Sequence, residues 1–296
     1  MTRNIYQEVT DRIITELETG TRPWIKPWSA DHAAVNITRP LRSTGEAYRG
    51  INTLLLWSAA ANNGYQSPYW LTFNQAKKIG AHVQKGEKGT AIVYASTIEK
   101  TGENDQGENV TEKIPFMKGY TVFNAEQVAD LPESWHPGVK QPEGGPERIG
   151  HAETFVNRTG ATIHEGGAQA AYSATLDLVK MPPLAAFQNA ETYYTTLLHE
   201  LTHWTKHPSR LDRNLGRKKW GDEGYAREEL VAELGSAFLA CDLSLELEPR
   251  EDHAAYIGSW LQLLRDDKRA IFEAAARAQS AADYLHQLQG AESAAA

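Results

Sequence analysis

The chain has 296 residues, of which 41% are hydrophobic, and a formal net charge of −8, so it is long enough to bury a sizeable core and more naturally forms two domains than one. Its single cysteine, Cys241, excludes an intramolecular disulfide and favours a reducing compartment. No run approaches the ~18 apolar residues of a membrane helix and the N-terminus lacks a continuous apolar core, so we expect a cytoplasmic protein without a membrane partner.

Composition divides the chain into two regions joined by a linker. Residues 1–130 carry equal numbers of cations and acids, so the whole acidic excess lies in residues 131–296. Nucleic acid is therefore easier to bind in the first half. Residues 131–150 hold four prolines and four glycines without an apolar period, as is typical of a linker. The predicted organisation is a domain over 1–130, a linker over 131–150, a domain over 151–289 and a tail over 290–296.

The first region mixes helices and strands. Apolar residues from Ile5 to Leu17 recur at helical spacing, and Gly20 is a stop signal. A Trp/Pro segment follows that is incompatible with a regular helix. Further along the chain, the pattern predicts a helix over about 52–64, a short helix begun by Thr72, and strands over 89–100 and 118–124 joined by a polar loop over 101–110.

The second region also mixes both kinds of element. It predicts strands over 161–166 and 170–182, then a long helix, a turn-rich loop over 207–224, a helix over 225–243 and two further helices within 250–289. Neither region alternates strand and helix as a parallel doubly wound sheet does. The predicted fold class is therefore α+β, in two domains.

The long helix of the second region contains the run His199-Glu200-Leu201-Thr202-His203. Residues four apart on a helix lie on one face, so both imidazoles can bind one tetrahedral ion, and Glu200 can act as general base on a water activated by that ion. The alternative is an amphipathic helix that carries two structural histidines. A third ligand decides between the two interpretations.

The helix over 225–243 supplies the candidates for the third ligand. Glu229 and Glu233 are one turn apart and lie beside its apolar stripe, whereas Glu228 is expected to face solvent. We predict that Glu229 binds the metal and that Glu233 does not, but accepts a hydrogen bond from one of the ligand histidines. The reverse assignment, with Glu233 as the ligand and Glu229 behind the histidine, remains open. His207 and His164 are weaker candidates.

The pattern HELTH, a turn-rich loop and then EELVAEL resembles the gluzincin-type metallopeptidases. That resemblance implies a zincin-like domain with Zn²⁺ as the cofactor, Mn²⁺ being the other ion considered, and hydrolysis of a protein substrate. The metzincin pattern fails because the chain lacks its glycine and third histidine. The strand over 170–182 precedes the helix, where zincins present an edge strand to substrate. For Tyr225 we favour a packing role over assistance to catalysis.

The first region combines aromatic and cationic residues. Unpaired bases stack on aromatic faces while cations contact phosphates, so this composition is typical of a surface that binds single-stranded nucleic acid. Tryptophans in a core and lysines on an ordinary surface are the alternative explanation. The residues predicted to bind DNA are Trp24, Trp28, Tyr48, Arg49, Trp70, Lys77, Lys78, Lys85 and Lys88.

The stretches RPWIKPW, YRGIN, YWLTFNQAKKIGAHVQKGEKGTAIVY and FNAEQV resemble the N-terminal domain of ArdC-type antirestriction proteins, a domain also present in plasmid TraC-like primases. With the HELTH and EELVAEL stretches, the resemblance covers roughly residues 1–289. It implies a single-stranded-DNA-binding domain followed by a zincin-like metallopeptidase domain, carried by a conjugative plasmid and protecting incoming DNA from host restriction enzymes.

Two functions of different classes follow from these patterns. The first is a peptidase directed by DNA binding, and the second is a DNA-masking protein whose metal domain is structural or latent. A metal-dependent nuclease is disfavoured, because such sites gather several carboxylates around Mg²⁺ rather than two imidazoles.

Overall fold

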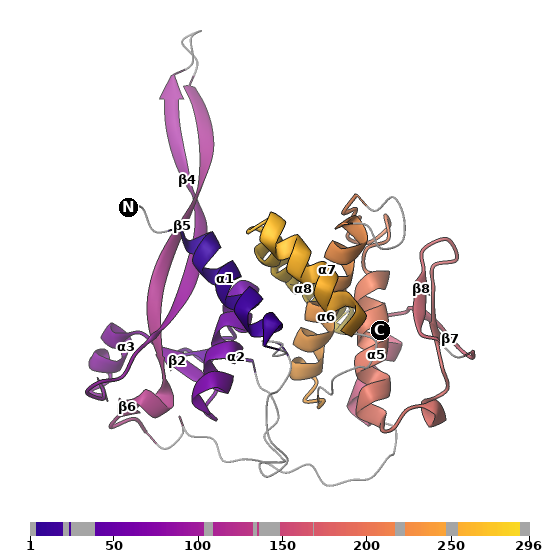
Figure 1. The fold of residues 1–296 in the computed structure, drawn as a ribbon, viewed down its shortest axis with the longest axis horizontal. Helices are drawn as coiled ribbons and strands as arrows, with labels where there is room; N and C mark the ends of the chain where they lie inside the picture. Colours follow the sequence, from indigo (N-terminus) through magenta and orange to yellow (C-terminus); the bar gives the residue numbers. More distant parts are fainter. Residues whose placement is uncertain are drawn as a thin grey trace.

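The computed structural model describes residues 4–19, 24, 39–103, 109–132, 135, 149–167, 169–216, 223–246 and 254–290. Its first half is a small twisted sheet with helices beside it (Figure 1). Helix α1 begins after Asn4, whose side chain accepts a hydrogen bond from the Gln7 amide, and α3 begins after Thr72, which forms a capping box with Gln75. The elements in order are α1 (Ile5–Glu18), β1 (Leu41–Arg42), α2 (Ile51–Asn63), β2 (Tyr69–Leu71), α3 (Phe73–Lys78) and β3 (His82–Val83).

A long antiparallel hairpin completes this half. Strands β4 (Thr90–Glu103) and β5 (Asn109–Asn124) pair along their whole length, and the four-stranded sheet has the order β1-β2-β5-β4. The hairpin projects well beyond the body of the molecule (Figure 1). Residues 101–103 and 109–110, which the sequence predicted to be loop, belong to the two strands, because strands in register satisfy each other's backbone groups even through polar residues. A 3₁₀ turn (Ala125–Gln127) and β6 (Val128–Ala129) follow.

The second half has a three-stranded sheet and a helical bundle. The segment predicted as one strand over 170–182 is a hairpin, because Asp177 adopts a positive φ of 47° between its two strands. Strand β9 is central and β8 is an edge strand. Helix α4 was not predicted and follows the linker directly. The elements are α4 (Gly150–Arg158), β7 (Thr162–Glu165), β8 (Ala171–Ser173), β9 (Leu178–Met181), a 3₁₀ turn (Leu184–Ala186), α5 (Ala190–Trp204), α6 (Glu223–Asp242), α7 (Ala254–Asp266) and α8 (Ala270–Gln287).

Helix α6 is the centre of the bundle. It packs against α5, α7 and α8, and from Gly224 to Cys241 every residue except Arg227 is buried. A helix buried on all sides has no solvent face, so polar residues on it must find partners inside the protein. This property of α6 determines the site described below.

The two halves of the chain share one hydrophobic core. Helix α1 contacts α7 and α2 contacts α8, and a continuous cluster joins Ile13 and Leu54 to Phe238 and Ile271. The N-terminal half therefore packs directly on the helical bundle, as Figure 1 shows. None of the described helices is long and apolar enough to cross a membrane.

Candidate metal centre

Helix α5 presents His199 and His203 on one face, one turn apart. Asn189 caps its N-terminus by accepting a hydrogen bond from the Thr192 amide at 2.8 Å. Both imidazoles are buried, with 6% and 7% of their residue surface exposed, and their ring centroids are 4.9 Å apart. The two rings therefore have the separation and direction needed to share one ligand.

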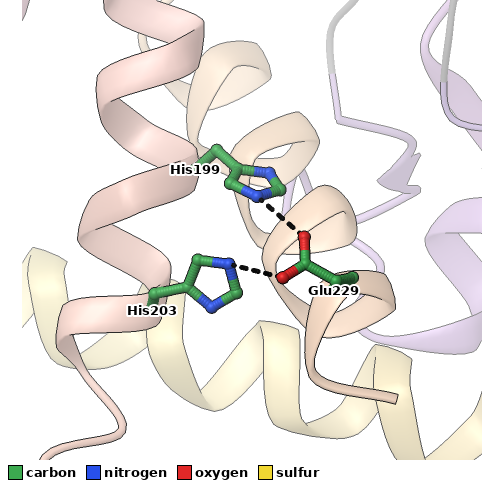
Figure 2. A group of neighbouring side chains, drawn as sticks. All are labelled: His199, His203 and Glu229. Atoms are coloured by element: carbon green, nitrogen blue, oxygen red, sulfur yellow. Dashed lines mark ion pairs between the residues drawn. The ribbon is translucent and has the colours of Figure 1, made fainter. Parts of the chain in front are cut away.

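Helix α6 brings Glu229 to these two rings (Figure 2). Its Oε2 is 3.6 Å from His199 Nε2, and its Oε1 is 3.5 Å from His203 Nε2. One potential ligand atom from each of the three residues lies within 4.8 Å of the other two. Ligand atoms around a tetrahedral zinc ion are about 3.4 Å apart, given bonds of about 2.1 Å. The donor set of two imidazoles and a carboxylate therefore fits a zinc site with one position left for another ligand.

The charge state of Glu229 suits this role. Burial raises the pKa of its carboxyl group, but hydrogen bonding and attraction from His199 and His203 outweigh burial and hold that pKa far below its ordinary value. The carboxylate is thus ionised at neutral pH and available to a cation. Of the alternative histidines, His207 bonds to Ser209 and His164 is exposed on β7, so neither belongs to the three-residue group.

Glu228 does not face solvent, so that prediction is wrong. It is 4% exposed, and its Oε1 is 3.0 Å from His203 Nδ1. Arg213 binds the same carboxylate through two nitrogens, both at 2.9 Å. The helical stripe predicted exposure, but α6 is enclosed on all sides, and Arg213, from the loop after α5, supplies the counter-charge.

Arg213, Glu228 and His203 form a hydrogen-bonded row of charged groups that orients the His203 ring. Burial raises the pKa of Glu228, but hydrogen bonds from Arg213 and His203 outweigh that effect and lower the pKa to about 2. Burial lowers the pKa of His203, but Glu228 and Glu229 outweigh that effect and raise it to about 9. With Glu228 beside Nδ1, the other ring nitrogen, Nε2, faces Glu229. A carboxylate behind a ligand histidine is a common feature of metal sites.

Glu233 lies behind the other histidine. Its Oε2 is 3.8 Å from His199 Nδ1, and its Oε1 accepts a hydrogen bond of 3.1 Å from the indole nitrogen of Trp24. Trp24 is 1% exposed and packs edge-on against Trp260. The prediction that Trp24 stacks on DNA is therefore wrong: this residue of the N-terminal region is inserted into the bundle beside the candidate metal centre.

Glu200 is bonded to strand β8 rather than to helix α6. Its Oε2 accepts a hydrogen bond of 2.8 Å from the backbone amide of Tyr172. This bond places the open edge of the sheet beside the motif helix, where the sequence predicted a substrate-binding strand. Tyr225 is 9% exposed, and its hydroxyl lies 2.9 Å from that of Tyr256. Burial and hydrogen bonds to Tyr256 and Glu229 raise the pKa of that hydroxyl, so Tyr225 contacts a proposed ligand and its role is not limited to packing.

Some of the residues predicted to bind DNA are buried and others are exposed. Tyr48 and Trp70 are 7% and 1% exposed and pack with Leu56 in a small core, so they cannot offer a face to a base and that prediction is wrong. Arg49 pairs with Asp283 of α8. The four predicted lysines are exposed, as a role in phosphate binding requires; they are Lys77, Lys78, Lys85 and Lys88. Trp28 lies outside the described residues.

Two contributors to the site were missed in the sequence. Arg213 lies in a loop, and Trp24 lies more than 200 residues before the glutamate that it contacts, so no periodic pattern indicated either. The available signal was the presence of an unexplained acidic residue, Glu228, on a helix with little polar surface to expose.

Comparison with known proteins supplies the family. Residues 3–123 match the model of the N-terminal domain of anti-restriction factor ArdC, and residues 150–277 match that of a zincin-like metallopeptidase. The protein y4eC of Sinorhizobium fredii is 42% identical over 97% of this chain and 92% of its own length. The DNA primase TraC of Escherichia coli is 39% identical over 95% of this chain, which spans only 27% of that primase.

Solved structures agree with these matches. The metal-free crystal structure of the antirestriction protein ArdC from plasmid R388 is 47% identical, with a TM-score of 0.84 over 98% of this chain and 99% of that one. The Mn(II)-bound structure of the same protein is 45% identical, with a TM-score of 0.81 over 97% and 99%. The α+β fold with two kinds of domain is thereby confirmed. The chain belongs to the ArdC family of antirestriction proteins and carries a zincin-like metallopeptidase domain.

Proposed function

We propose that this antirestriction protein binds single-stranded DNA through its N-terminal half and hydrolyses a protein substrate at the site formed by His199, His203 and Glu229. The observation that supports the peptidase is the convergence of these three buried ligand atoms beside Glu200. The proposal for DNA is supported by the match to the ArdC N-terminal domain and by the exposed lysines of the first half.

The proposed ligands of a divalent cation are the two histidine Nε2 atoms and the Glu229 carboxylate. Zinc is the ion typical of this donor set, and the Mn(II)-bound ArdC structure favours Mn²⁺ as a second ion. A bound ion would polarise the scissile carbonyl and make water acidic enough to react near neutral pH. Glu228, 3.0 Å from Nδ1 of His203, would orient that ring, and Glu233, 3.8 Å from Nδ1 of His199, would do so for the other ring after a small approach.

Glu200 moves the proton in this proposal. The Tyr172 amide holds Oε2, which leaves Oε1 to take a proton from water and to deliver it to the leaving amine. Low exposure limits competition from bulk solvent around this carboxylate. Edge strand β8 lies beside Glu200, so an extended peptide would bind along it through backbone groups other than the Tyr172 amide, which Glu200 already accepts from.

Replacing Glu200→Gln tests the peptidase. The substitution preserves size and removes the base, so we expect hydrolysis to fall by about 10²–10⁴. The measurement is a mass-spectrometric survey of new protein N-termini in restriction-proficient cells expressing either form. Glu191→Gln, in the first turn of the same helix, is the matched control. If the wild-type protein generates no termini beyond those of the Glu200 variant, the chain is not a peptidase.

A transfer assay distinguishes the peptidase from DNA masking. Plasmid DNA that contains restriction sites is transferred into a restricting host, and the survival of the DNA is scored with each variant. Protection lost with Glu200→Gln supports a proteolytic mechanism. Protection retained with this variant would support DNA masking, the second candidate function.

A further inference from the structure

Large apolar side chains are exposed on the projecting hairpin. Tyr94 on β4 is 52% exposed and Tyr120 on β5 is 43% exposed. The Trp24, Tyr48 and Trp70 side chains are buried and cannot stack on bases. Among the described aromatic residues of this half, Phe73 on α3 is also exposed, at 56%, but the hairpin tyrosines are two exposed rings that contact each other. Contiguous exposed aromatic residues often mark a binding surface.

The strand register places these rings side by side. Tyr94 is directly opposite Lys118, and Tyr120 and Phe116 lie two residues to either side of that lysine. Side chains two residues apart on a strand share a face, so all four project from the same face of the hairpin. The Tyr94 ring is 6.1 Å from that of Tyr120 and 6.2 Å from that of Phe116. We call Tyr94, Phe116 and Tyr120 the aromatic ladder.

The aromatic ladder is not needed for the main core. The opposite face of the hairpin supplies that contact: Val93 is buried in the main cluster and Met117 packs against it. On the ladder face, Ile92 joins the small core around Trp70 only at the base of the hairpin. A sheet face in contact with water is normally polar. Three rings in a row on this face therefore need an explanation other than folding.

The charge around the aromatic ladder favours an anion. Lys118 is exposed and lies between two of the rings in the register. The exposed Lys77 and Lys78 lie on α3, which follows β2 at the base of the same sheet and could contact the backbone of a strand that runs beyond the ladder. Flat rings beside lysines are complementary to unpaired bases and their phosphates, whereas the bases of a duplex are already stacked.

We propose that the aromatic ladder and Lys118 form a stacking platform for the bases of single-stranded DNA. This inference rests on the proposed function and assigns a site to its DNA-binding half. The ladder lies on the face opposite the one that packs on the main core. DNA on this platform therefore leaves the candidate metal centre uncovered.

The test uses the full chain and a fluorescent oligothymidylate longer than the roughly 16 nucleotides that one such domain occupies. Binding is followed by fluorescence anisotropy at several salt concentrations. We expect Tyr94→Ala and Tyr120→Ala each to weaken binding by roughly 5- to 150-fold, the effect of losing one stacked base. Tyr94→Phe keeps the ring and should bind like wild type. Lys118→Gln should reduce the slope of log K against log salt by about 0.7.

Leu176→Ala is the matched control, since Leu176 is 62% exposed but lies in the turn between β8 and β9. Thermal melts establish that each variant folds, as expected for substitutions of exposed residues. If Tyr94→Ala and Tyr120→Ala both bind DNA as tightly as the wild type does, the platform is overturned and DNA must bind elsewhere on the protein. No binding by the wild-type chain would overturn the platform together with the DNA-binding half of the proposed function.

Discussion

At the scale of single residues, Glu228 shows how a buried charge is tolerated. Its carboxylate is bonded to two nitrogens of Arg213 and to His203, and Arg213 also donates to Thr202 and Thr205. Burying an ion pair is costly unless its remaining donors and acceptors are satisfied, and this network satisfies them. The pair therefore contributes more to the orientation of His203 than to net stability.

Removing one member of this pair should be severe. We expect Glu228→Ala to lower the free energy of unfolding by about 3–5 kcal/mol, because Arg213 is left buried without a counter-charge. The measurement is urea denaturation monitored by circular dichroism. Glu223→Ala is the control, since the Glu223 side chain is 69% exposed and Arg227 on the same helix keeps its pair with Asp267, so the loss should be only about 0.3–0.5 kcal/mol. Equal losses for the two variants would show that Arg213 finds another partner or solvent.

At the scale of elements, α6 explains which predictions succeeded. Its position follows from its many apolar residues, and the helical period places Glu229 and Glu233 one turn apart on the same face. The same pattern failed for Glu228, because a stripe assumes that one side of a helix meets water. In this fold α7, α8 and the segment ending at Arg213 enclose the remaining sides.

Trp24 connects the first half of the chain to helix α6. Its indole nitrogen donates to Glu233, which in turn lies beside His199. We expect Trp24→Phe to weaken zinc affinity by up to about tenfold, the lower end of the effect of losing a partner behind a metal ligand. Competition with a fluorescent chelator measures this affinity.

Trp260→Phe is the control for that variant. Trp260 is as deeply buried as Trp24, but its indole nitrogen has no hydrogen-bond partner within the part of the chain that the structure describes. We therefore expect this substitution to leave zinc affinity unchanged. An equal loss of affinity in both variants would assign the effect of Trp24 to packing rather than to its hydrogen bond.

At the scale of the whole molecule, one cluster joins the two halves. Arg39 is 8% exposed, and it donates to both oxygens of Asp242 on α6 and to Gln279 on α8. His286 lies 3.0 Å from the same carboxylate. Burial raises the pKa of Asp242, but His286 and Arg39 outweigh it and lower that pKa from its ordinary value of 3.8.

This cluster predicts how stability depends on pH. A carboxyl group whose pKa is lower in the folded state stabilises the fold above its unfolded pKa, and this contribution is lost as pH falls through the folded pKa. We expect the free energy of unfolding to decline below about pH 4, and Asp242→Asn to reduce that decline. Urea titrations at several pH values measure both. An identical decline in the variant would mean that other carboxyl groups determine the acid sensitivity.

The sequence by itself determined the local features of this protein. Helical spacing placed His199, Glu200 and His203 on α5 and brought Glu229 to the buried stripe of α6, because these relations depend only on the period of a helix. Turn signals and alternation likewise located most helices and both strands of the long hairpin.

Only the tertiary structure decided which surfaces remain exposed. Burial of Trp24, Tyr48, Trp70 and Glu228, and exposure of Tyr94, depend on contacts between segments far apart in the chain. Periodicity describes one element at a time, whereas burial depends on how many neighbours enclose that element. For this reason the proposed metal ligands were accessible to sequence reasoning, while the aromatic faces proposed to bind DNA were not.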